Sequence, residues 1–122
     1  MVLDFDHSTP IYLQVARMIR DAVVSGDLPE GEAIPSVRQV SVEHGLNPQT
    51  VLNANHLLIE EGILEKRRGI GFFVKEGARK SLLQAERERF KGDDVPALVN
   101  RAKLLGLSQQ ATVNLVKERF KE

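Results

Sequence analysis

Residues 47–75, "NPQTVLNANHLLIEEGILEKRRGIGFFVK", decide the fold because the spacing of their apolar side chains changes after Gly62. Before that glycine, apolar residues recur at helical spacing and predict the inner face of a helix. These residues are Val51, Ala54 and Leu58. After it, alternation predicts two short strands, about 63–66 and 71–75, joined by a tight turn at 67–69. The stretch therefore predicts a helix followed directly by a β-hairpin.

The helix in this stretch has an unusual polar face. Pro48 keeps Asn47 out of the helical conformation, which suits a capping residue. The exposed face carries neutral groups that donate and accept hydrogen bonds: Gln49, Asn53 and His56. The edges of bases in a DNA major groove present the same mixture, and the helix amino terminus, with Asn47 and Thr50, suits a phosphate. Such a face, taken alone, is usually only a solvated surface.

Two more helices are expected before this stretch. Residues 8–10, Ser-Thr-Pro, predict a start with a hydroxyl cap and proline at the first helical position, and Gly26 predicts the end. Ser36 can cap a second helix that runs to about His44. Two short helices separated only by "GLN" (45–47), with a helix before and a hairpin after, describe a winged helix-turn-helix.

The remaining residues, 76–122, are expected to be helical, with breaks near Gly92 and Gly106. So short a region could bury its apolar side chains in its own core, but we favour burial against a second copy of the chain. The expected dimerisation residues are Leu82, Leu83, Phe90, Leu98, Leu105, Val113, Val116 and Phe120. The expected organisation is a winged helix-turn-helix domain at 1–75 and a helical dimerisation region at 76–122, mainly α with a small β-hairpin.

Charge is unevenly divided, although the whole chain is neutral with 17 Lys or Arg and 17 Asp or Glu. Residues 1–75 hold 7 basic and 10 acidic residues, a net charge of −3, and residues 76–122 hold 10 and 7, a net charge of +3. Three of the seven basic residues of the first region stand together in "EKRR", residues 65–68. Any binding to DNA must therefore depend on a few placed cations.

Several classes of function find no support in the residues. The chain has no cysteine for a disulfide or a thiolate zinc site, and its three histidines are never spaced as a pair of ligands. Its acidic pairs come without an oriented nucleophile and base, so we expect no metal, no cofactor and no enzyme. No apolar run reaches the roughly 20 residues that span a bilayer, and the amino terminus lacks signal-peptide features. We expect a cytoplasmic protein.

Residues 10–75 resemble the GntR family of bacterial transcription regulators. The resemblance is carried, in order, by "PIYLQV", "SGDLPEGEAIPSVR", "NPQTV" and "EEGILEKRRGIGFFV". The "NPQTV" variant and the short carboxyl-terminal region are similar to the YtrA-type subfamily, in which a short pair of helices serves dimerisation. The resemblance implies a dimeric, sequence-specific DNA-binding regulator, most simply a repressor on a palindromic operator. It leaves the effector unknown.

The resemblance also implies roles for individual residues. Arg38 matches an arginine that reaches DNA from the second helix, and Ser36 matches the residue that caps this helix. Asn47 matches the cap of the recognition helix, and Thr50 matches a threonine that touches phosphate. The wing tip, which usually enters the minor groove, corresponds to Arg67, Arg68 and Gly69.

Three departures from the family pattern affect the recognition helix. Pro48 and Leu52 stand where relatives have arginines, and Asn55 replaces a common aromatic or aliphatic residue. This helix should therefore recognise guanine more weakly than the helices of those relatives do. Arg38, the amides and the wing should contribute a larger share of the affinity for DNA. A second hypothesis follows from these departures, namely a winged-helix module that binds protein and has lost its DNA affinity.

Overall fold

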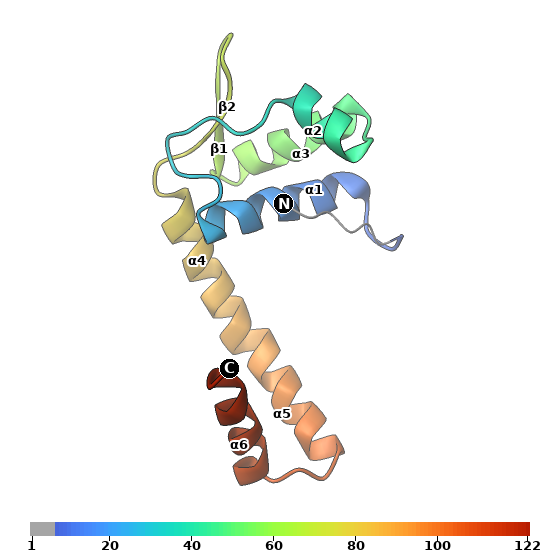
Figure 1. The fold of residues 1–122 in the computed structure, drawn as a ribbon, viewed down its shortest axis with the longest axis vertical. Coiled ribbons are helices and arrows are strands. Elements are labelled where there is room, and N and C mark those ends of the chain that lie inside the picture. Colours follow the sequence, from blue (N-terminus) through green and yellow to red (C-terminus); the bar gives the residue numbers. More distant parts are fainter. Residues whose placement is uncertain (1–6) are drawn as a thin grey trace. The chain divides into compact units, whose positions relative to one another are not determined.

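The computed structural model describes residues 7–122, which form two compact units (Figure 1). We call the first unit, which ends at Leu83, the head, and the second, Gln84–Glu122, the tail. Residues 1–6, on which part of the signal-peptide expectation rests, lie outside the described residues. The elements are α1 (Ile11–Ser25), α2 (Val37–His44), α3 (Pro48–Glu60), β1 (Leu64–Arg67), β2 (Gly71–Val74), α4 (Ala78–Arg89), η1 (Phe90–Asp94), α5 (Val95–Leu104) and α6 (Gln109–Phe120).

The head confirms the predicted winged helix-turn-helix. Three helices precede one antiparallel hairpin, whose strands pair up to Arg67 and Gly71 at the tip. The connector between α1 and α2 adds a bridge between Ala33 and Phe73, which ties the hairpin to the helical part of the head. The fold is therefore mainly α with a small β-hairpin.

Helix α1 begins one residue later than the sequence predicted. Pro10 is the N-cap and not the first helical residue, and no side chain caps the helix. The Pro10 carbonyl instead accepts hydrogen bonds from the N–H groups of Leu13 (3.1 Å) and Gln14 (3.3 Å). The extended backbone of Pro10, with ψ 139°, explains the shift, because a residue in this conformation lies outside the helix. Gly26 ends the helix as predicted, with φ +89°.

Both helices of the helix-turn-helix begin as predicted. Ser36 and Gln39 form a capping box, in which the Gln39 N–H donates to Ser36 Oγ (3.1 Å) and the Ser36 N–H donates to Gln39 Oε1 (2.8 Å). Asn47 Oδ1 accepts from the Gln49 N–H at 2.8 Å, and Pro48 is the first helical residue. These local bonds fix where the recognition helix starts.

The head encloses a single apolar core that extends into α4. The largest fully buried apolar side chains are Leu58, Leu64, Val15, Val23, Val51 and Val74. Ala78 and Leu82 of α4 join this core, with 2% and 8% of their surfaces exposed. The first turns of α4 therefore belong to the head. Leu82, expected at a dimer interface, packs into the core of the head of its own chain.

The tail differs from its prediction at one point. The break expected near Gly92 is absent, since a π-helical turn, Phe90–Asp94, leads from α4 into α5. A glycine inside a helix costs only about 1 kcal/mol relative to alanine, so it does not by itself end one. Gly106, with φ +74°, separates α5 from α6 as expected. Ser108 caps α6, and its hydroxyl accepts from the Ala111 N–H at 3.1 Å.

Candidate nucleic-acid interface

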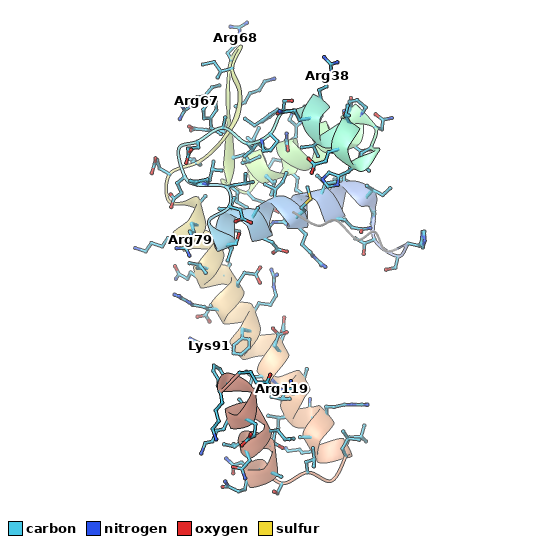
Figure 2. The ribbon with its side chains drawn as sticks, viewed as in Figure 1. Arg38, Arg67, Arg68, Arg79, Lys91 and Arg119 are labelled. Carbon is cyan, nitrogen blue, oxygen red and sulfur yellow. The ribbon has the colours of Figure 1, made fainter. Side chains whose placement is uncertain are left out.

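Arg38 projects from α2 with an exposed side chain. Its guanidinium makes no hydrogen bond or ion pair with any of the described residues, 7–122. Figure 2 shows Arg38 and Arg68 extending to the same edge of the head, one from α2 and one from the hairpin. The Ser36 hydroxyl is occupied in the capping box, so its role in the structure is to position the helix that carries Arg38.

The exposed amides of α3 form a pair. Gln49 Nε2 donates to Asn53 Oδ1 over 2.9 Å, one helical turn apart. Gln49 Oε1 and Asn53 Nδ2 are left to accept and donate together toward the solvent. This combination matches the adjacent acceptor and donor of an adenine edge in the major groove. Thr50, half-buried at the start of the same helix, donates its N–H to the Asn47 carbonyl at 3.0 Å.

Phe72 joins the hairpin to the recognition helix. The ring of exposed His56 meets Phe72 edge-on, with centroids 6.5 Å apart. Lys66 lies opposite Phe72 in the strand register, and its Nζ is 5.8 Å from the same ring centroid. Lys66 is thus a further exposed cation beside the recognition helix. The sequence showed Lys66 within "EKRR", but only the cross-strand register places it against Phe72, the ring that also contacts His56.

The two arginines predicted at the wing tip have different environments. Arg67 is the last residue of β1, forms an ion pair with Glu65 (3.0 Å) and lies 3.9 Å above the centre of the Phe73 ring. Arg68 is exposed and has no partner among the described residues. Gly69 turns the chain with φ +76°, a conformation that residues with a side chain rarely adopt. The freely available charge of the tip is therefore that of Arg68.

Two groups of contacts within the head hold the helices in place. Arg20 of α1 forms a two-pronged ion pair with Glu61 at the end of α3, with distances of 2.9 and 2.8 Å. Arg79 Nε donates to the Val24 carbonyl (3.0 Å), and the Gly77 N–H donates to a carboxylate oxygen of Glu30. The first pair orients the recognition helix, and the second contacts attach the start of α4 to the head.

Asn55 is the unexpected residue of α3. It is 1% exposed, and neither polar atom of its side chain has a hydrogen-bond partner among residues 7–122. Burying an amide without partners costs roughly 1–3 kcal/mol, so this residue weakens the head. The sequence marked Asn55 as a departure but could not show that it faces the core.

The tail exposes apolar side chains along both of its helices. Two grooves, of about 360 and 500 Å³, lie on either side of the contact between α5 and α6. Five of the predicted dimerisation residues line them: Leu98, Leu105, Val113, Val116 and Phe120. Phe90 is 58% exposed but lines neither groove, and Leu83 is half-buried in the head.

Other kinds of site are not found in the described part of the chain. Within residues 7–122, no cluster of three or more histidine or acidic residues could hold a metal ion. Over the same residues, no helix is long and apolar enough to cross a membrane.

The sequence pattern described as "Bacterial regulatory proteins, gntR family" matches residues 11–74. The chain is 31% identical over 113 residues to YhcF of Bacillus subtilis (strain 168), an uncharacterized HTH-type transcriptional regulator, covering 93% of this chain and 92% of YhcF. It is 30% identical over 116 residues to the HTH-type transcriptional repressor YtrA of the same strain, covering 95% and 88%. The likeness to both relatives therefore extends through the tail.

Solved structures of transcription regulators are similar to this chain as well. A GntR family transcriptional regulator from Listeria monocytogenes superposes with a TM-score of 0.77 and 26% identity, over 93% of this chain and 98% of that chain. The DNA-binding domain of AraR, solved in complex with an operator, matches with a TM-score of 0.54 and 26% identity, over 61% of this chain and 89% of that chain.

Proposed function

The chain belongs to the GntR family of bacterial regulatory proteins, and on that premise we propose that it represses transcription as a homodimer on a palindromic operator. The family and the relatives are DNA-binding transcriptional regulators and not enzymes. Repression is proposed because YtrA, similar over nearly the whole chain, is named a repressor. Such a regulator works where the bacterial chromosome lies, in the cytoplasm.

One observation carries the proposed contact with DNA. At one edge the head presents Arg38 and Arg68, two arginines whose side chains have no partner among residues 7–122, although its first 75 residues are acidic overall. An unpaired guanidinium that faces solvent can neutralise a phosphate without first breaking an ion pair. We propose that α3 lies in the major groove, where Gln49 and Asn53 contact base edges and His56 completes the face. Asn47 and Thr50 contribute at the phosphate facing the helix start.

The tail supports the proposed dimer. Its exposed apolar residues line grooves on both sides of the α5–α6 contact, and a second copy of the tail would supply matching apolar side chains. We propose residues 84–122 as the dimerisation region and the preceding residues as the DNA-binding domain. A two-fold dimer implies an inverted-repeat operator with half-sites about one helical turn apart.

The test measures affinity for duplex DNA as a function of salt, using the intact chain and two single variants. Arg68→Ala should lower the magnitude of the slope of log affinity against log salt by about 1 per protomer. Arg67→Ala is the matched control and should change the slope less, because its charge is already paired with Glu65. Binding that hardly depends on salt would favour the alternative, a module that binds protein.

A further inference from the structure

The wing tip carries an exposed apolar side chain that no role described so far uses. Ile70 is 71% exposed and follows Gly69 in the turn between β1 and β2. Its N–H donates to the Arg67 carbonyl at 3.0 Å, which closes the turn. Hairpin turns favour glycine, asparagine, aspartate and proline, so the turn itself does not call for isoleucine.

The neighbours of Ile70 leave its side chain bare. Gly69 and Gly71 flank it, and a methyl group added to either glycine would meet no heavy atom within 4 Å apart from those of its immediate chain neighbours. The tip is therefore a narrow edge of backbone that presents one exposed aliphatic side chain, two residues after Arg68. A minor groove about 6 Å wide admits only such a narrow element.

The floor of the minor groove offers one chemical difference that an aliphatic group can detect. A·T pairs present acceptors there, whereas a G·C pair adds the 2-amino group of guanine, a donor that projects into the groove. An aliphatic side chain pressed against that amine removes its water and gives no acceptor in return. Against an A·T pair the same side chain meets no unpaired donor.

We propose that Ile70 makes the wing select A·T over G·C pairs by excluding the guanine 2-amino group from the minor groove. The inference rests on the proposed function, because it requires the wing to contact DNA. It goes beyond that function by assigning base selection to an aliphatic residue of the tip.

The experiment uses the intact protein and a duplex selected by it from a random pool. At each pair protected by the wing, A·T is replaced by G·C and, separately, by inosine·cytosine, which lacks the 2-amino group but resembles G·C in the major groove. The wild type should lose on the order of tenfold in affinity with G·C, from the unpaired donor, and little with inosine·cytosine. Ile70→Ser should bind both replacements within about twofold of each other.

Val42→Ser is the matched control, since Val42 is an equally exposed aliphatic residue (75%) on α2. It should keep the tenfold discrimination. Equal affinity of the wild type for G·C and inosine·cytosine, or full discrimination by Ile70→Ser, overturns the proposal for Ile70. If Arg68→Ala still weakens salt-dependent binding in that case, the proposed function stands. A wild type without salt-dependent DNA binding overturns both.

Discussion

The head and the tail are built from similar apolar residues but place them differently. The head buries its large aliphatic side chains in one core, while Ala102 is the only buried apolar residue of the tail in the described part of the chain. The tail instead exposes leucines and valines along α5 and α6. The difference supports the proposal that the tail, unlike the head, packs its apolar side chains against a partner surface.

The largest effect should follow from disrupting the proposed dimer interface of the tail. Leu98 lines both grooves, so Leu98→Asp places a charge in the proposed interface. We expect a monomer at micromolar concentration by sedimentation and a loss of specific operator affinity of at least about a hundredfold, because two linked half-sites become one. Leu104→Asp is the control, since Leu104 is 75% exposed and lines neither groove. A dimeric Leu98→Asp protein would disprove the assignment of this surface.

The second test distinguishes two roles for Leu82, namely packing in the core of the head and contact with a second subunit. Leu82→Ala should lower the free energy of unfolding of the head by about 2–3 kcal/mol, the usual cost of a cavity in a core, and leave the protein dimeric. Leu83→Ala, at a half-buried position one residue later, should cost less. Denaturant unfolding and sedimentation provide the two readings. Loss of the dimer without loss of stability would return Leu82 to the interface.

The third test concerns the buried Asn55, the one residue of α3 that we expect to destabilise the core of the head. Asn55→Leu should raise the free energy of unfolding by about 1–2 kcal/mol, because it removes a buried amide that has no partner in the described part of the chain. Thermal unfolding of the variant and of the wild type, each with and without DNA, would measure this change in stability. Asn53→Leu, two residues away and exposed, should leave stability nearly unchanged. A destabilised Asn55→Leu protein would show that the amide has a partner when the protein folds.

The smallest effect concerns the amide pair on α3. If Gln49 and Asn53 act as one unit, alanine at either should cost nearly as much specificity as alanine at both. The coupling free energy from a double-mutant cycle on a selected operator should be about 0.5–1 kcal/mol. Affinity for random duplex DNA should barely change, since no charge is removed. Strictly additive losses would mean that the two amides contact DNA independently.

Local signals made much of the head predictable. The caps at Ser36 and Asn47 and the change from helical to alternating spacing identified α2, α3 and the hairpin, because each depends on residues within a few positions. The exposed amides of α3 followed from the same spacing. The start of α1 was displaced by one residue because the backbone of Pro10 is extended.

Features that depend on distant residues were not predictable. The position of Arg67 over Phe73 requires the strand register. Its pairing with Glu65, two residues earlier on the same face of β1, requires only that this segment be a strand, yet our prediction from the sequence treats both wing arginines as equally free. The burial of Leu82 depends on which face of α4 packs against the head, and an amphipathic pattern does not identify the surface that covers it. The π-helical turn that contains Gly92 was also not predictable, because a glycine in the sequence looks the same whether a helix ends there or continues.

The attachment of α4 to the head has a consequence for how such proteins can be recombined. The family match ends at residue 74, yet the head's core is closed by Ala78 and Leu82, and Glu30 and Arg79 fasten the helix that carries them. A gene fusion made directly after the match would join a new partner to a head with an open core. A chimera that keeps residues up to Leu83, or whose partner begins with a helix bearing a small residue and a leucine four positions later, would replace the tail and leave the proposed DNA-binding surface intact.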